Sequence, residues 1–521
     1  MNRSALSRRL RQFLPRASII DRADSLRAYE CDGLSAYRQT PLLVALPESI
    51  AQVRQTLRAC HALRVPVVSR GAGTGLSGGA LPHAQGIVLS LAKMNRVLGI
   101  DAENRVARVQ PGARNIVISE AARPLGLFYA PDPSSQIACS IGGNVAENAG
   151  GVHCLKYGLT VHNIAALKIA TIDGALINLG GGAVLDAEAG AGDSTGPGDS
   201  TGAGDSPGPD TVAPTAPAAA LDAPGLDLTA LLVGSEGMLG VVVEATVNLR
   251  PLPQAAVVLL GAFDAVQPAA DAVAAIIGAG ILPAGVEMMD APAIRAAEAF
   301  AAAGYPRDAA AILLCELDGF EAEVGAQAEA VRAIMQRHRA TAIRAATDAA
   351  ERAKLWSGRK SAFPAIGRIS PDYYCIDGSI PRRHLGRVLA EIGRLSGEYG
   401  LRVANVFHAG DGNLHPLILY DANRDGELQR TEELGARILE CCIAAGGSIT
   451  GEHGVGVEKI DSMCAQFSAA ELAQFHAVRE AFDPLRLLNP GKAIPTLARC
   501  AEHNAMHVHR GQVAFPDLER F

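Results

Sequence analysis

A glycine-rich loop directly after an apolar strand constrains the fold of this chain most strongly. The run Val65–Val68 is typical of a buried strand, and Arg70–Gly79 after it holds five glycines in ten residues. Glycines let backbone N–H groups turn toward an anion at close range, and the hydroxyls of Thr74 and Ser77 add donors. Because the loop is tethered to a strand, the pattern favours a cradle for a diphosphate over a freely flexing loop.

The same loop contains a G-x-G-x-x-G pattern at Gly73, Gly75 and Gly78, which is found in nicotinamide-binding Rossmann folds. Two features argue against that fold. The residues that follow, Gly79–Pro82, do not open a long helix, and the next strand, Gly86–Leu91, offers no acidic end for a ribose. We therefore reject the Rossmann interpretation.

Two further segments are also rich in small residues. The first combines Pro131–Gln136 with Ile141–Gly151, and the second is Gly234–Gly240, which leads into a strand. Such density of Gly and Asn between apolar residues implies a backbone packed closely against a flat ligand.

The bulk composition limits the class of protein. The chain has 521 residues, of which 49% are hydrophobic and 19% charged, so it predicts a folded protein of two or three domains. A net charge of -7 argues against nucleic acid as a partner. No apolar run approaches the roughly 20 residues that span a bilayer, which indicates a soluble or at most peripheral protein. The cysteines form no C-x-x-C pair, so we expect reduced thiols of a cytoplasmic protein and neither a disulfide framework nor an iron–sulfur site.

Two stretches stand apart from the rest. A six-residue repeat beginning Gly192–Pro197 lies within about 187–220 and has no aromatic, Lys or Arg residue. A solenoid would need large apolar side chains, so a disordered surface insertion is the better interpretation. The N-terminus is basic, which suits either a solvated helix or an amphipathic helix at a membrane surface.

Local patterns predict several elements. A capping box at Ser49–Gln52 starts a helix. In the first half, strands are expected at 65–68, 86–91, 166–171 and 240–249. In the second half, strands are expected at 257–263, 285–289, 311–317, 341–345 and 402–407, with helices at 266–279, 321–338 and around 385–395.

A histidine-rich motif provides the second chemical signal. His408 and His415 flank the turn residues Asp411-Gly412 between two apolar runs, so the two imidazoles should face each other across a bend. Imidazoles placed in this way are good ligands for zinc or a similar divalent ion, and Glu452 is a candidate third ligand, followed directly by His453.

The three glycine-rich segments, in this order, resemble the FAD-binding half of flavoproteins of the vanillyl-alcohol-oxidase type. The stretch from Pro131 to Thr160, which includes His153–Gly158, resembles the flavin subunits of bacterial glycolate oxidases more closely still, and this likeness extends over nearly the whole chain. The resemblance implies an α+β fold. Residues 1–253 would form an FAD-binding domain of two α+β subdomains, residues 254–480 an α+β cap domain that binds substrate and metal, and residues 481–521 a C-terminal segment returning to the first domain.

The resemblance also assigns site residues. It implies that His408, His415 and Glu452 hold the metal and that His453 acts as the base. It places Arg359 at the substrate carboxylate, with Arg368 as a weaker second choice and Asn413 in the same pocket; a salt bridge is the alternative role for either arginine. FAD, bound without a covalent link because Arg70–Gly79 lacks histidine, would contact Arg70, Gly71, Ala72, Gly73, Thr74, Gly75, Ser77, Gly78, Pro131, Asp132, Ser135, Gly142, Gly143, Asn144, Asn148, Gly150, Gly151, Glu236, Gly240, Val241 and Asn489.

The reaction implied by the resemblance is FAD-dependent oxidation of glycolate, or of a small D-2-hydroxy acid, to the 2-oxo acid. Electrons would pass to a complex with a second flavoprotein subunit and an iron–sulfur subunit, which could bring the chain to the periphery of the inner membrane. Two alternatives remain open. One is a D-lactate or D-2-hydroxyglutarate dehydrogenase on the same scaffold, and the other is a non-catalytic, flavin-carrying assembly subunit.

Overall fold

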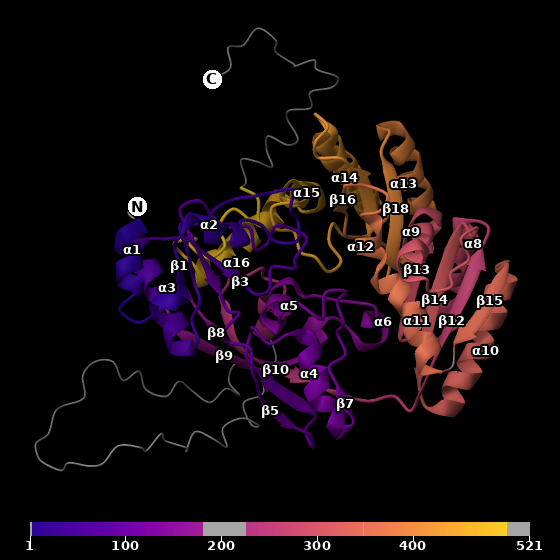
Figure 1. Cartoon of the computed structure of the whole chain (residues 1–521), viewed down its shortest axis with the longest axis horizontal. Helices are drawn as coiled ribbons and strands as arrows, with labels where there is room; N and C mark the ends of the chain where they lie inside the picture. Colours follow the sequence, from indigo (N-terminus) through magenta and orange to yellow (C-terminus); the bar gives the residue numbers. More distant parts are fainter. Residues whose placement is uncertain (1–2, 181–225, 347, 497–521) are drawn as a thin grey trace, which may run out of the picture.

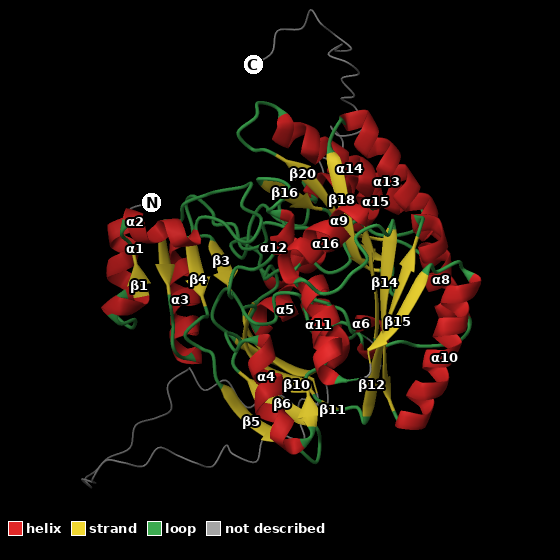
Figure 2. Cartoon of the chain, turned by 45° about the vertical axis from the view of Figure 1, so that its right-hand side comes forward, coloured by secondary structure: helices red, strands yellow, loops and turns green. Residues whose placement is uncertain are grey.

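A computed structural model describes residues 3–180, 226–346 and 348–496, which form two domains side by side (Figure 1). The predicted insertion at 187–220 lies outside the described residues, as does the last part of the predicted C-terminal segment. The N-terminal domain contains two main sheets, whereas the C-terminal domain is built on one large sheet (Figure 2). The predicted α+β class is confirmed.

The first sheet of the N-terminal domain delivers the chain into the glycine loop. Strands β2, β4 and β3 are parallel, and β1 joins the edge antiparallel. Helix α3 begins at the predicted cap, where Ser49 Oγ accepts the N–H of Gln52 at 3.3 Å, although Gln52 Oε1 reaches back to the N–H of Glu48 instead of Ser49. The elements are α1 (Arg3–Leu10), β1 (Ile19–Ile20), α2 (Ala23–Leu26), β2 (Leu43–Ala45), α3 (Ile50–Leu63), β3 (Val67–Arg70) and β4 (Ile87–Ser90).

The second sheet of this domain is antiparallel, in the order β5-β6-β10-β8-β9. Its helices include α5, which carries part of the small-residue segment Ile141–Gly151. The strands predicted at 65–68, 86–91, 166–171 and 240–249 are confirmed as β3, β4, β8 and β10. The remaining bounds are β5 (Val97–Asp101), β6 (Val106–Val109), α4 (Asn115–Ala122), β7 (Leu127–Phe128), α5 (Ile141–Glu147), α6 (Cys154–Tyr157), β8 (Ile164–Ala170), β9 (Leu176–Gly180), α7 (Leu228–Leu232), β10 (Val241–Asn248) and β11 (Arg250–Pro251).

The C-terminal domain follows the predicted strands and helices. Its sheet has the order β15-β12-β14-β13-β18-β19-β17, and β20 joins β18 to β16. The bounds are β12 (Ala255–Phe263), α8 (Val266–Gly278), β13 (Gly285–Asp290), α9 (Ala291–Ala301), β14 (Ala311–Gly319), α10 (Glu321–Arg337), β15 (Ala342–Ala346), α11 (Ala349–Lys360), α12 (Ala362–Ile366), β16 (Asp372–Cys375), β17 (Gly378–Ser379), α13 (Leu385–Tyr399), β18 (Arg402–His408), β19 (Asn413–Leu414), β20 (Pro416–Tyr420) and α14 (Glu427–Ala444).

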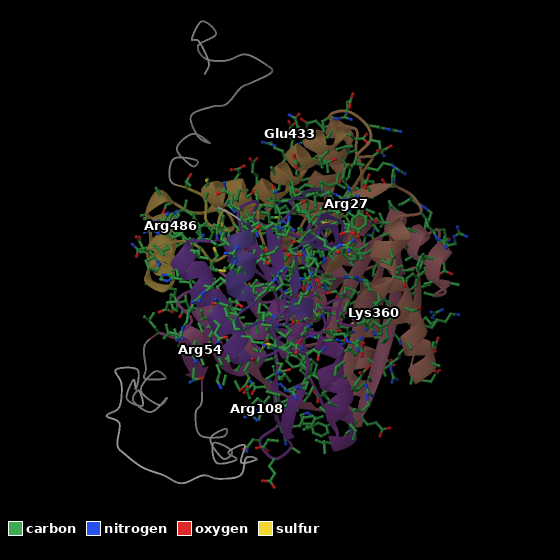
Figure 3. The ribbon with its side chains drawn as sticks, turned by 60° about the vertical axis from the view of Figure 1, so that its left-hand side comes forward. Arg27, Arg54, Arg108, Lys360, Glu433 and Arg486 are labelled. Carbon is green, nitrogen blue, oxygen red and sulfur yellow. The ribbon has the colours of Figure 1, made fainter. Side chains whose placement is uncertain are left out.

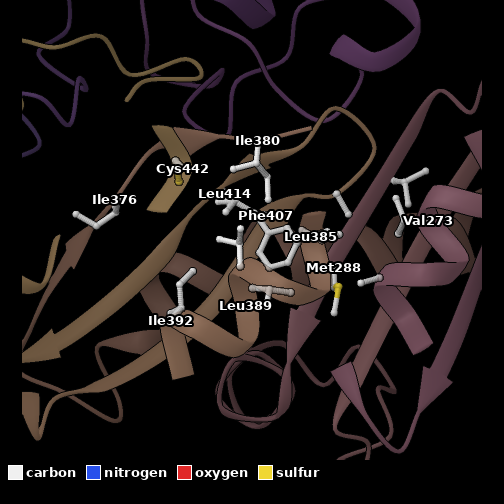
Figure 4. Close-up of a cluster of buried hydrophobic side chains, with 14 of the residues drawn as sticks. Val273, Met288, Ile376, Ile380, Leu385, Leu389, Ile392, Phe407, Leu414 and Cys442 are labelled. Atoms are coloured by element: carbon white, nitrogen blue, oxygen red, sulfur yellow. The ribbon is translucent and has the colours of Figure 1, made fainter. Parts of the chain in front are cut away.

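Both faces of this sheet are buried, because successive side chains of a strand point to opposite faces. Phe407 of β18 packs with α8 and α13 on one face, as Figure 4 shows around Val273 and Leu385. The preceding residue, Val406, belongs to the core on the other face, where Leu355 and Ala362 come from α11 and α12. The sheet is therefore rigidly held up to the end of β18, where His408 lies.

The C-terminal part of the described chain returns to the N-terminal domain. Helices α15 (Ile460–Gln466) and α16 (Ala469–Phe482) lie beside its elements in Figure 1. The N–H of Val67 donates to Leu487 O, and Asn489 donates back to Val67 O, both at 2.8 Å. Earlier in the chain, the N–H of Val455 donates to Glu236 Oε1 of the N-terminal domain at 2.7 Å.

The cysteines depart from expectation at one position. Cys464 is disulfide-bonded, whereas we expected reduced thiols throughout. The other cysteines of the described chain are free: Cys31, Cys60, Cys139, Cys154, Cys315, Cys375, Cys441 and Cys442. Within the described residues, no helix is long and apolar enough to cross a membrane.

Candidate active site

A single cavity of about 340 Å³ brings the glycine-rich segments and the histidine motif together. Its volume lies in the usual range for a ligand pocket. Thirteen of the predicted cofactor residues line it: Arg70, Gly71, Ala72, Gly73, Thr74, Gly75, Ser135, Gly142, Gly143, Asn144, Glu236, Gly240 and Val241. His415, Glu452 and His453 line the same cavity, so the two signals found in the sequence belong to one site.

The glycine loop Arg70–Gly79 follows β3 and lies close against the start of α5. A Cβ at Gly71 would collide with Ser140 Oγ, the N-cap of α5, so the approach of the two loops requires glycine there. Gly73 has a φ of +73°, a conformation that other residues rarely adopt. The loop and the start of α5 thus present backbone to the cavity, as the sequence predicts for a diphosphate and flavin site.

The other predicted cofactor residues do not line the cavity. Two of them make hydrogen bonds to the protein near the cavity. Asn489 Nδ2 donates to Gly79 O at 3.0 Å and to Glu236 O at 2.6 Å. Asn148 Oδ1 accepts the N–H of Val161 at 2.9 Å. The predicted cofactor residues that do not line the cavity are Ser77, Gly78, Pro131, Asp132, Asn148, Gly150, Gly151 and Asn489. Polar residues in such motifs can hydrogen-bond to the loops instead of to the ligand. The sequence pattern does not distinguish these two roles.

The histidine motif forms the predicted bend. β18 ends at His408, β19 pairs Asn413 with His408, and His415 precedes β20. The centroids of the two imidazole rings lie 5.1 Å apart at an interplanar angle of 81°. His408 and His415 are 3% and 2% exposed, so both imidazoles are removed from bulk water.

Glu452 lies in the loop Gly451–Gly456 and approaches both imidazoles. Its Oε1 lies 3.2 Å from His408 Nε2 and 3.4 Å from His415 Nε2. Burial opposes ionisation of this carboxyl, but His408 and His415 outweigh it and lower the pKa of Glu452 to about 2. The three donor atoms lie within 4.8 Å of one another.

The residues present fit a divalent cation. Both ring nitrogens of His415 are buried without a hydrogen bond, which is costly unless a ligand satisfies them. Glu287, which the sequence analysis missed, lies 2.7 Å from His408 Nδ1 and so leaves Nε2 directed toward Glu452. A carboxylate behind a histidine in this way is typical of metal sites. Neutral imidazoles with one carboxylate form a donor set suited to zinc.

His453 lies next to this set. Its ring stacks on that of His415, with centroids 4.8 Å apart and planes at 13°, and its Nε2 lies 3.9 Å from Glu452 Oε1. Burial lowers the pKa of His453 to about 4, which keeps the ring neutral near pH 7. A neutral imidazole in a cavity can accept a proton. A second possible donor set, Asp377 with His415 and His453, shares His415.

Asp377 holds the loop that carries Glu452 and His453. Its buried carboxylate accepts N–H groups from Gly451 (3.1 Å), Glu452 (3.1 Å) and His453 (2.9 Å), and Lys459 Nζ donates to it at 3.0 Å. Burial acts against ionisation, but Lys459 lowers the pKa of Asp377 well below its usual range. The sequence analysis missed this residue; an acid two residues after the end of strand β16 was the available signal.

The predicted substrate residues lie in different places. Arg359 is 1% exposed and outside the lining, with its Nε donating to Glu287 Oε2 at 2.7 Å. Arg368 lies away from the site, where it donates to Ala299 O and covers the ring of Phe300. Asn413 is buried, and its Oδ1 has no hydrogen bond within the described chain. Lys360, next to Arg359, does line the cavity, and Figure 3 labels it.

Two acidic side chains, the buried Glu236 and the half-buried Glu147, lie where the loop of His453 meets the glycine-rich segments. Glu236 accepts the N–H groups of Val455 at 2.7 Å and Gly456 at 2.8 Å. Glu147 lines the cavity, and its Oε2 is buried without a hydrogen bond. Burial, together with the charge of Glu236, raises the pKa of Glu147 well above its usual range. The glycine-rich segments and the loop of His453 therefore meet at one buried junction.

Family models match most of the chain. Residues 41–180 match the FAD binding domain, and residues 252–493 match the C-terminal domain of FAD linked oxidases. The fold and the cavity thus define an FAD-dependent oxidoreductase. Among solved structures, p-cresol methylhydroxylase and the 4-ethylphenol oxidase from Gulosibacter chungangensis each align with a TM-score of 0.74 at 16% identity, over 95% and 94% of this chain and 97% of theirs. They share the fold.

Sequence relatives narrow the family. The glycolate oxidase subunit GlcD of Escherichia coli strain K12 is 57% identical over 100% of this chain and 97% of its own length. GlcD of Bacillus subtilis is 36% identical over 90% and 93%, and a D-2-hydroxyglutarate dehydrogenase of Xanthomonas citri pv. viticola is 30% identical over 94% and 96%. The chain belongs to the family of glycolate oxidase flavin subunits.

Proposed function

We propose that the chain oxidises glycolate, or a closely related D-2-hydroxy acid, to the 2-oxo acid. The observation that carries the proposal is the shared cavity, which is lined both by the glycine loops and by His415, Glu452 and His453. A 2-hydroxy acid bound beside these side chains would have its C2 next to the flavin. The 57% identity with a glycolate oxidase subunit favours glycolate as the substrate.

The residues have separate roles in this proposal. FAD would supply a hydride acceptor, and a divalent metal held by His408, His415 and Glu452 would make the substrate hydroxyl more acidic. His453 accepts the hydroxyl proton, since its ring is neutral and lies against His415. Glu287 orients His408, and Arg359 pairs with Glu287 from behind. Asp377 keeps Glu452 and His453 turned into the cavity.

The electrons would leave through partner subunits. The curated relatives are named as subunits, which supports assembly with further chains. The sequence has no C-x-x-C pair for an iron–sulfur centre, so we assign that centre to a separate subunit, beside a second flavoprotein subunit. Association with the inner membrane would then be peripheral and through the complex, from the cytoplasmic side.

Substrate preference is tested by anaerobic mixing of the FAD-loaded chain with glycolate, D-lactate and D-2-hydroxyglutarate. We expect glycolate to bleach the flavin absorbance with the highest kcat/KM of the three acids. A clear preference for either longer acid would assign the chain to that dehydrogenase, a class represented among its 30%-identical relatives. Absence of bleaching by all three would favour the non-catalytic assembly subunit.

A further inference from the structure

The motif His153–Gly158 lies at the boundary between the two domains, where α6 is next to the large sheet of the C-terminal domain (Figure 1). None of its residues lines the cavity. Lys156 Nζ donates to Asp318 Oδ1 at 2.5 Å, and the hydroxyl of Tyr157 donates to Asp318 Oδ2 at 2.7 Å. Because Asp318 belongs to β14, the motif fastens the N-terminal domain to the large sheet.

His153, the first residue of the motif, pairs with a carboxylate of each domain. Its Nδ1 lies 2.8 Å from Asp132 Oδ2, and its backbone N–H donates to Asp132 Oδ1 at 3.1 Å. On the other side of the ring, Nε2 lies 3.6 Å from Glu316 Oε2, on β14. An imidazole can donate to a carboxylate from both nitrogens only when it is doubly protonated. Burial opposes that charge, but Asp132 and Glu316 outweigh it and raise the pKa of His153 well above its usual range.

Both carboxylates lead from His153 to the lining of the cavity. Asp132 directly precedes the lining residues Pro133–Ser135. Glu316 accepts the indole N–H of Trp356, which lies on α11 about one turn before Lys360, another lining residue. One imidazolium therefore connects the lining contributed by the N-terminal domain with the lining at the end of α11.

The bridge Asp132–His153–Glu316 is built into the backbone and shielded from water. Gly151 has a φ of +147°, and a Cβ there would lie 2.4 Å from Asp132 O, so the approach of the motif to the loop of Asp132 requires glycine. The side chains of Asp132 and Glu316 are 12% and 15% exposed. Ion pairs that are largely buried are screened much less than surface pairs. The bridge can thus hold its two ends at a fixed separation.

We propose that His153 is a positioning residue that fixes the loop Pro131–Ser135 relative to α11, and so sets how a 2-hydroxy acid bound between them meets the flavin. This proposal rests on the function proposed above and adds a residue that lies outside the cavity lining. Its effect should fall on the rate of flavin reduction, because a misplacement of about 1 Å can slow a reaction by on the order of 10²-fold.

The test is anaerobic stopped-flow reduction of the FAD-loaded variants His153→Gln and Glu316→Gln by saturating glycolate. Each variant breaks the same bridge, so each should slow reduction by about 10- to 100-fold, and the double variant should be no slower than the single variants. The affinity for acetate, which has the carboxylate of glycolate but no hydroxyl to oxidise, should change little. Acetate binding is followed by perturbation of the flavin spectrum, and the ratio of FAD to protein should stay the same.

Tyr157→Phe is the matched control, because it removes a hydrogen bond across the same domain boundary and keeps the ring that packs on Phe128. It should reduce its flavin at nearly the wild-type rate. Equal slowing in this control would overturn the proposal, since any contact between the domains would then suffice.

The remaining outcomes also decide the proposal. A wild-type rate in His153→Gln or Glu316→Gln would overturn it, as would loss of FAD or of acetate affinity, which would place His153 in binding. Slowing in the double variant by the product of the single effects would show two separate roles and no bridge. A wild-type flavin that none of the three hydroxy acids bleaches would instead overturn the proposed function itself, and this proposal with it.

Discussion

Asp377→Ala is expected to destabilise the FAD-loaded chain by about 3–5 kcal/mol and to abolish flavin reduction by glycolate. The substitution removes the nearer acidic partner of Lys459, which is 1% exposed, and leaves only Glu458 Oε2 at 3.9 Å. It also frees the backbone N–H groups of Gly451, Glu452 and His453. The loop that presents the third metal ligand and the base would then lose its anchor. Urea unfolding of the holoprotein and anaerobic stopped-flow reduction measure the two effects.

Two control variants distinguish the loss of the loop's anchor from a general loss of stability. Asp425→Ala removes an exposed acid of the same domain and should change neither quantity. The double variant Asp377→Ala/Lys459→Met removes the stranded charge, so it should regain part of the stability without regaining activity. If Asp377→Ala reduces its flavin at the wild-type rate, the carboxylate is not what holds Glu452 and His453 in place.

His453→Ala should slow flavin reduction by roughly 10²–10⁴-fold while the metal and the FAD stay bound. The KM for glycolate should move much less, because a general base acts mainly in the transition state. His408→Ala, His415→Ala and Glu452→Ala should instead lower the metal content and weaken substrate binding, since each removes one ligand. Metal analysis beside stopped-flow reduction of each variant distinguishes the two patterns.

The structure provides a definite alternative to this division of labour. Asp377, His415 and His453 form a second group of donors within 4.8 Å of one another. If the metal occupied that group, His453→Ala would lose the metal as readily as His415→Ala, and Glu452→Ala would retain it. Such a result would make His453 a ligand and require another base.

Local patterns carried much of the fold and of the site. The glycine loop after β3 and the turn between His408 and His415 are set by residues close in sequence, so their geometry follows from turn chemistry and from the approach that Gly71 allows. The strands of both domains follow from apolar runs. In the large sheet, these runs are buried on both faces. The resemblance to a flavoprotein family supplied the order of the domains.

The supporting residues could not be predicted in the same way. Glu287 lies 121 residues from His408 in the sequence, and Asp377 lies 76 residues from His453, so neither pairing has a local pattern. Arg359 and Lys360 are adjacent, and only packing decides that the first faces Glu287 and the second faces the cavity. Asn489 matched a cofactor position but bridges Gly79 and Glu236, because buried backbone carbonyls need donors.

The measurement that tests the central claim most directly is flavin reduction by glycolate in protein depleted of metal but still loaded with FAD. The claim is that one cavity uses FAD together with a cation on His408, His415 and Glu452. Chelator treatment should leave the flavin spectrum and the ratio of FAD to protein unchanged, abolish anaerobic bleaching by glycolate, and allow bleaching to return when zinc or a similar divalent ion is restored. Bleaching at an unchanged rate in the metal-free protein would contradict the claim.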